Sequence, residues 1–157
     1  PEASIGKAQH EISAADVSTL VERLAARMRA NPADADGWYM LARTYTAIGR
    51  YQDAVLAYER LLVLVPDDSA VLADYADVLA TVQGGSFAGK PELLVAQALK
   101  HDPQDVKALA RAGSAAYQKG DMDAARRHWN AVLPLVPADT DLHRNTLASL
   151  ARIQPSA

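Results

Sequence analysis

Apolar residues recur three and four positions apart along most of this chain, and short polar segments interrupt them at regular intervals. Such spacing predicts amphipathic α-helices and not strands. Four of these polar segments contain a proline, which ends the helix before it, and an aspartate two residues later that can cap the next helix. The pattern predicts helices over residues 14–30, 35–48, 51–64, 69–83, 91–101, 106–119, 121–135 and 140–153.

Four of these Pro-x-Asp segments divide the chain into nearly equal lengths. The prolines stand 34, 37 and 34 residues apart, and we expect each aspartate to be an N-cap; the pairs are Pro32 and Asp34, Pro66 and Asp68, Pro103 and Asp105, and Pro137 and Asp139. A 34-residue period of paired helices is typical of tetratricopeptide (TPR) repeats. The predicted fold is therefore an all-α, right-handed TPR solenoid with three repeats, at about 35–68, 69–105 and 106–139. A lone helix precedes them and a capping helix over 140–153 follows them.

The first repeat matches the TPR pattern of large and small residues closely, with Trp38, Tyr45 and Tyr58 at its aromatic positions. We expect these three side chains, and Trp129 in the third repeat, to lie in the core. The middle repeat departs from the pattern through three extra residues within segment 83–90, which we interpret as a flexible turn before a helix that starts at Pro91. This segment resembles a phosphate-binding loop, but a proline replaces the required Ser or Thr and no strand precedes it.

Composition and motifs narrow the function. The net charge of −3 argues against a nucleic-acid partner, and the chain has no cysteine and no apolar run long enough to span a bilayer. The four histidines have no metal-ligand spacing, and no catalytic motif occurs. We therefore expect no enzyme activity, metal or cofactor. Because the chain opens with Pro1, we expect a fragment whose membrane anchor or export signal preceded it, with a flexible segment over 1–13 and an unstructured tail over 154–157.

The first helix of each repeat carries a second stripe of residues that should face a concave groove. The predicted peptide-binding residues on and beside this stripe are Tyr39, Met40, Arg43, Ala73, Asp74, Asp77, Ala110, Arg111, Ser114 and Tyr117. Two alternatives stay open. Arg43 and Asp77 could simply pair with each other across repeats, and Tyr117 could be ordinary interhelix packing.

Several segments resemble one particular family. They are residues 37–45, residues 72–80, the insertion that ends at Gly89, residues 98–103, and residues 107–109 with Ala112 and Gly113. Together they are similar to the C-terminal periplasmic TPR domain of the CcmI/CycH-type cytochrome c maturation factors and to their relative NrfG. The resemblance covers about residues 14–153.

The resemblance implies a periplasmic chaperone for apocytochrome c. Members of this family hold the C-terminal helix of the apocytochrome in the TPR groove and present its Cys-x-x-Cys-His segment to the haem-ligation complex. It also implies a tether to the inner membrane through an N-terminal portion, and we expect the isolated domain to be a monomer. The absence of cysteine suits this role, because a free thiol could form mixed disulfides with the client. The alternative is a generic TPR scaffold for an unrelated protein complex.

Overall fold

The computed structural model describes residues 2–153, with side chains from residue 15 onward, and every regular element in that range is helical. The elements are α1 (Glu2–Ala30), α2 (Ala35–Ala47), α3 (Tyr51–Leu64), α4 (Ser69–Val82), α5 (Lys90–His101), α6 (Val106–Gln118), α7 (Met122–Val132), the 3₁₀ helix η1 (Leu133–Leu135) and α8 (Asp141–Arg152). The predicted all-α architecture is confirmed, and most helix boundaries agree within one or two residues.

The first helix is the main exception, because α1 begins at Glu2 and not near residue 14. Residues 2–13, which we expected to be a flexible segment, therefore belong to the helix. Physically, this stretch contains several good helix formers, such as Ala, Glu and Lys, and no proline that would end a helix. The tail that we expected to be unstructured, Gln154–Ala157, lies outside the described residues.

The aspartates of the Pro-x-Asp segments cap three helices as predicted. Asp34, Asp68 and Asp105 accept hydrogen bonds from the backbone N–H groups three residues later, at 3.0, 3.2 and 3.0 Å. The fourth prediction is wrong, because Thr140 and not Asp139 caps α8, with its hydroxyl accepting from the N–H of His143 at 3.3 Å. Thr140 directly precedes the first helical residue, and this is the position from which a side chain reaches the free N–H groups.

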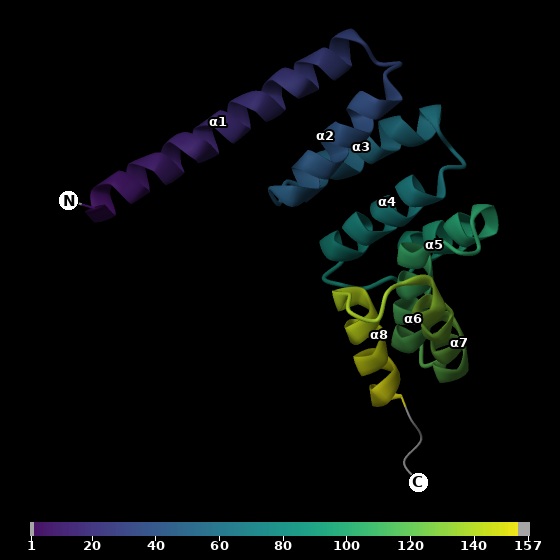
Figure 1. The fold of residues 1–157 in the computed structure, drawn as a ribbon. Helices are drawn as coiled ribbons and strands as arrows, with labels where there is room; N and C mark the ends of the chain where they lie inside the picture. Colours follow the sequence, from purple (N-terminus) through teal and green to yellow (C-terminus); the bar gives the residue numbers. More distant parts are fainter. Residues whose placement is uncertain (1, 154–157) are drawn as a thin grey trace. The chain divides into compact units, whose positions relative to one another are not determined.

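The chain divides into two compact units, which meet in sequence between Leu64 and Val65. In the N-terminal unit, α2 packs against α3, and the second half of α1 packs on α2 (Figure 1). Met28 of α1 lies directly over Gly37, where a Cβ atom would overlap the methionine sulfur. The end of the Met28 side chain fills the space that the glycine leaves open.

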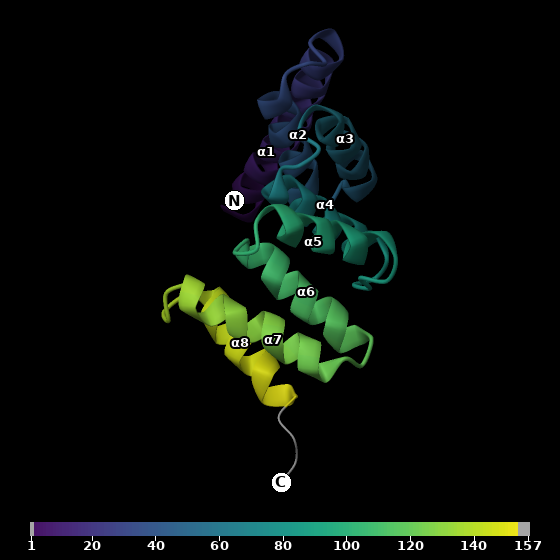
Figure 2. The ribbon, with the colours of Figure 1, turned by 90° about the vertical axis from the view of Figure 1, so that its right-hand side faces the viewer.

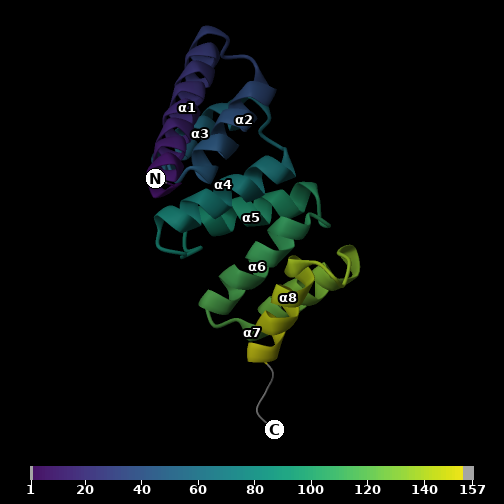
Figure 3. The same cartoon turned by 60° about the vertical axis from the view of Figure 1, so that its left-hand side comes forward.

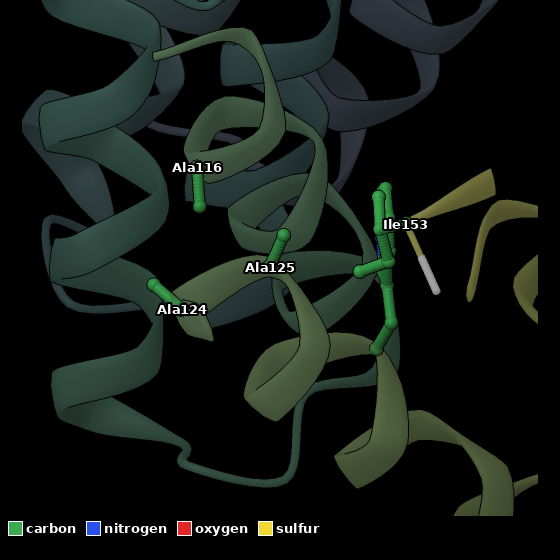
Figure 4. Close-up of a cluster of buried hydrophobic side chains, with 5 residues drawn as sticks. Ala116, Ala124, Ala125 and Ile153 are labelled. Atoms are coloured by element: carbon green, nitrogen blue, oxygen red, sulfur yellow. The ribbon is translucent and has the colours of Figure 1, made fainter. Parts of the chain in front are cut away.

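The C-terminal unit contains α4 to α8. Here α4 packs on α5 and α6 packs on α7, while α8 lies against α7 (Figures 2 and 3). One buried cluster joins the last three helices through Ala116, Ala124, Ala125, Trp129 and Ile153 (Figure 4). Trp129 packs where Gly113 leaves room, and its indole N–H donates to the carbonyl of Ala110 at 3.1 Å.

Three of the four aromatic residues expected in the core are there. Tyr45, Tyr58 and Trp129 are buried. Trp38 is not, since it is half-buried and lines a surface hollow with Ala25 and Leu41. Its indole N–H donates to the carbonyl of Pro32 at 2.9 Å, so the ring is held at the edge of the unit and not inside it.

The insertion between α4 and α5 is tied down by hydrogen bonds, whereas we predicted a flexible turn. The side-chain amide of Gln118 accepts from the N–H of Phe87 and donates to the carbonyl of Gly85, both at 2.8 Å. Gln83 donates to two further carbonyls in the loop, and the Phe87 ring is buried. Pro91 lies in the first turn of α5 as predicted, where its missing N–H costs nothing.

We expect Gly113→Ala to destabilise the C-terminal unit by about 1–3 kcal/mol, because the new methyl group overlaps the Trp129 ring. Helix propensity alone would change stability in the opposite direction, by up to about 1 kcal/mol. Urea unfolding followed by circular dichroism measures the change in the free energy of unfolding. The sign of this change shows whether the overlap with Trp129 or the helix propensity dominates. A gain in stability would contradict the close approach described here.

Candidate functional site

Within the described part of the chain, no cluster of three or more His, Asp or Glu residues could hold a metal ion. No helix in that part is both long enough and apolar enough to cross a bilayer. The predicted peptide-binding residues lie on both compact units, and each unit is described separately.

In the N-terminal unit, the three predicted residues of α2 lie together at the surface. Tyr39, Met40 and Arg43 line a shallow hollow of about 510 Å³ with Asp36 and Thr44. Met40 is 61% exposed, and the Arg43 guanidinium lies 5.6 Å from the centre of the Tyr39 ring. This arrangement offers an adaptable apolar side chain, an aromatic face and a positive charge to a ligand.

In the C-terminal unit, the predicted charged residues form ion pairs between α4 and α6. Lys107 Nζ lies 2.7 Å from Asp74 Oδ1 and 3.4 Å from Asp77 Oδ2. Arg111 Nε lies 2.6 Å from Asp77 Oδ1, and its NH2 donates to Asp77 Oδ2 at 3.2 Å. Two carboxylates and two cations therefore balance each other. The surface formed by these four residues carries no net charge toward a ligand.

Lys107 is a member of this network that our prediction left out of the binding set. The sequence could have predicted its contact with Asp74, because Lys107 stands 33 residues after Asp74, close to one repeat period. We also predicted that Arg43 and Asp77 could pair with each other. These two residues belong to different compact units, so this pairing stays a prediction. Within its own unit, Asp77 already contacts Lys107 and Arg111.

The remaining predicted residues differ in how much surface they offer. Ala73 and Ala110 are buried, which gives them a packing role, and the hydroxyl of Ser114 donates to the carbonyl of Ala110. Tyr117 packs its ring 5.9 Å from that of Trp129 and still exposes 37% of its surface. The Arg152 guanidinium lies 5.9 Å from the Tyr117 ring centre. The Tyr117 side chain therefore packs between helices and also exposes part of its ring to solvent.

A second hollow, of about 180 Å³, lies between α5, α6 and α7 and was not predicted. Its floor consists of alanines and its rim carries His128 and the ion pair of Lys119 with Glu92, at 2.6 Å. Burial, and then the nearby Arg127 charge, lower the pKa of His128, so its imidazole is neutral at pH 7. The hollow is too small for most organic ligands.

We expect Asp77 and Arg111 to be energetically coupled by about 0.5–1 kcal/mol, because the pair is only partly exposed and links two repeats. A double-mutant cycle with Asp77→Asn and Arg111→Met, measured by urea unfolding, gives this coupling. The matched control is the more exposed pair of Asp141 and Arg144, for which the coupling should be near zero. Equal coupling in both cycles would contradict a structural role for the network.

The chain was compared with protein families and with curated relatives. A family model described as the TPR domain of cytochrome c-type biogenesis protein H matches residues 3–143. The cytochrome c-type biogenesis protein CycH of Bradyrhizobium diazoefficiens is 32% identical over 142 residues, which covers 89% of this chain and 38% of the relative. CycH of Pseudomonas aeruginosa is 32% identical over 118 residues, covering 75% of this chain and 29% of the relative.

A more distant relative and a solved structure extend the comparison. The formate-dependent nitrite reductase complex subunit NrfG of Escherichia coli O157:H7 is 25% identical over 115 residues, which covers 73% of this chain and 58% of NrfG. A crystal structure of a tetratricopeptide repeat protein from Parabacteroides merdae is similar with a TM-score of 0.72 and 21% identity, covering 95% of this chain and 58% of the other. This structural similarity confirms the TPR fold. The chain spans about a third of the length of the CycH relatives.

Proposed function

Because the chain belongs to the family of cytochrome c-type biogenesis protein H TPR domains, we propose that it acts in cytochrome c maturation as a chaperone for apocytochrome c. In this proposal it binds the C-terminal helix of the apocytochrome and holds the client for haem ligation. The relatives are named for cytochrome c biogenesis, and this supports the pathway. A periplasmic location and a membrane tether in the full-length protein are part of the same proposal.

The observation that carries the proposal is the exposed surface of α2 formed by Tyr39, Met40 and Arg43. An amphipathic helix binds a groove through an apolar stripe at positions i, i+3, i+4 and i+7. Met40 can adapt to such a stripe, and Tyr39 adds aromatic contact area. Arg43 can donate hydrogen bonds to a client carboxylate, because it has no ion pair within the described part of the chain.

The C-terminal unit would contribute shape more than charge to client binding. Its two carboxylates and two cations between α4 and α6 are already paired, so they keep the surface neutral and the two helices aligned. Tyr117 then provides an exposed aromatic contact on α6, and Ser114 beside it is partly exposed. Ala73 and Ala110 are buried, so they keep a packing role and are not part of the proposed contact surface.

A handover protein must release its client, so we expect modest affinity. A client segment that folds on binding loses roughly 2–5 kcal/mol to ordering. A net affinity in the micromolar range corresponds to about −8 kcal/mol and suits this role.

Calorimetric titration with two synthetic apocytochrome c peptides tests the proposal. We expect the C-terminal helix peptide to bind with a dissociation constant in the micromolar range and the Cys-x-x-Cys-His peptide to bind at least about tenfold more weakly. Binding of neither peptide would exclude the chaperone role for this domain. The remaining candidate would then be a TPR scaffold for an unrelated protein complex.

Substitutions on α2 test where the helix peptide binds. Tyr39→Ala and Arg43→Ala should each weaken binding by about fivefold or more, which corresponds to about 1 kcal/mol, while the thermal unfolding transition changes little. The control is Leu93→Ala on α5, which removes an apolar side chain that is 70% exposed and lies outside the proposed site. Unchanged affinity in both α2 variants would place the client elsewhere on the molecule.

A further inference from the structure

A hollow of about 470 Å³ lies between α1, α2 and α3, inside the N-terminal unit. Its wall on α2 is formed by Trp38, Leu41 and Tyr45, which are spaced so that they share one face of the helix. None of the residues that line it also lines the hollow proposed for the client. Its volume is that of sites that hold small ligands or a few side chains. The helix α2 therefore borders a second hollow that the proposed function does not use.

This hollow offers apolar and aromatic contact area. Leu41 and Ala57 line it as buried residues, Trp38 is half-buried, and Leu56 of α3 is 61% exposed. The indole N–H of Trp38 already donates to the carbonyl of Pro32, so its ring is left for apolar contact. A half-buried tryptophan with an exposed leucine in the same hollow can anchor a large apolar side chain of a partner.

The charges in the lining favour an acidic ligand. The carboxylate of Asp53 is already held by Arg50, whose Nε donates to it at 2.8 Å, and Glu59, the other acidic residue in the lining, is also engaged. Arg29 and Arg60 line the same hollow, and neither has an ion pair with any residue that the structure describes. Two cations are therefore available to carboxylates that come from outside the chain.

The C-terminal unit has different residues at the corresponding positions. Ala57 and His128 each stand 25 residues after the proline that precedes their repeat. His128 lines the smaller hollow of about 180 Å³, so an imidazole ring stands there where the N-terminal hollow has only a methyl group. Arg60 corresponds in the same way to Ala131. The size and the charge of the N-terminal hollow therefore come from its own side chains and are not a property of every repeat.

We propose that this hollow is a second peptide-binding site, whose ligand is an extended acidic segment of a partner protein with a large apolar residue beside its carboxylates. The apolar side chain packs against Trp38 and Leu56, and the carboxylates accept hydrogen bonds from Arg29 and Arg60. A guanidinium suits this role because two of its N–H donors match the two oxygens of a carboxylate. A purely apolar segment would leave both arginines without a partner, which is why an acidic one is favoured.

A synthetic peptide with Leu-Asp-Glu-Leu at its centre, flanked by glycine and serine and blocked at both ends, is the probe. Calorimetric titration into the whole chain should give a dissociation constant in the micromolar range. The matched peptide with Leu-Asn-Gln-Leu has nearly the same shape without charge, and it should bind at least about tenfold more weakly. Failure of the acidic peptide to bind, or equal affinity for both peptides, overturns the proposal.

The fluorescence of Trp38 reports where the acidic peptide binds. The other tryptophan, Trp129, is buried in the C-terminal unit, so the emission of Trp38 should change on binding and that of Trp129 should not. The variant Trp38→Phe should remove the fluorescence change. A change that persists in this variant would place the peptide elsewhere and contradict the proposed site.

Substitutions with matched controls test the two kinds of contact. Arg29→Gln, Arg60→Gln and Leu56→Ala should each weaken binding of the acidic peptide by about fivefold or more. The control for the charge is Arg27→Gln, since Arg27 is exposed in the same last turn of α1 and does not line the hollow. The control for the leucine is Leu93→Ala, which stands at the same repeat position in α5, is 70% exposed and lies outside the hollow.

All five of these side chains are exposed, so the variants should stay folded, and circular dichroism melting checks this. Equal losses in the test and control variants would overturn the proposal, because the effect would then not belong to the hollow.

Competition experiments separate this site from the client site. Saturation with the apocytochrome helix peptide should leave the affinity for the acidic peptide unchanged, because the two hollows share no lining residue. Displacement of one peptide by the other would overturn the assignment of a separate site. Succinate at about 1 mM should not displace the acidic peptide, and displacement would mean that the hollow binds a free dicarboxylate and not a peptide segment. The acidic peptide is titrated directly, so its result stands whether or not the client peptide binds.

Discussion

The close approach of two helices, with a small residue facing a large one, is the constraint on which the rest of this structure depends. Gly113 faces Trp129 within the third repeat, and Gly37 faces Met28 where α1 meets α2; at both places a single methyl group would overlap its neighbour. These contacts fix the spacing of a helix pair. The other small residues on the facing sides of the two helices then pack against each other at helical intervals. The positions of exposed side chains such as Tyr117, which rests on Trp129, follow from that spacing.

The helix packing also distinguishes two kinds of surface. In one, the side chains contact a neighbouring helix, and in the other they are exposed and can contact a ligand. Between α4 and α6 the helices are aligned by ion pairs whose charges cancel, so this region holds the repeats together. On α2, by contrast, Met40 is largely exposed, and Arg43 lies against an aromatic ring and has no ion pair with any residue that the structure describes. The two regions come from equivalent helices of successive repeats. The residue types at the outward positions, and not the repeat itself, therefore decide which surface can take a partner.

Contacts between residues close in sequence explain why most helix boundaries agree with the prediction, and other specific contacts explain the exceptions. Proline ends a helix and aspartate caps the next one through contacts within four residues, so helix boundaries could be predicted well. The predictions were wrong at positions where another contact, not considered in the sequence pattern, determined the local structure. Thr140 lies one residue nearer to α8 than Asp139, and Gln118 reaches back from α6 to hold a loop that looked flexible by composition. Trp38 has the sequence position of a core residue, but its indole bonds to Pro32 at the edge of the unit.

The sequence by itself determined the repeat period and the all-α fold, because period, helix spacing and Pro-x-Asp boundaries are local properties that no distant contact can change. Specific segments, such as residues 37–45 and 72–80, carried the resemblance to the family. It also assigned Tyr39, Met40 and Arg43 to one helix, and in the structure the three residues line one surface hollow. Only the tertiary structure decided which candidate side chains are buried and which charges are already paired. Those outcomes depend on side chains about one repeat apart in sequence, such as Asp74 and Lys107, whose contact exists only after the helices have packed.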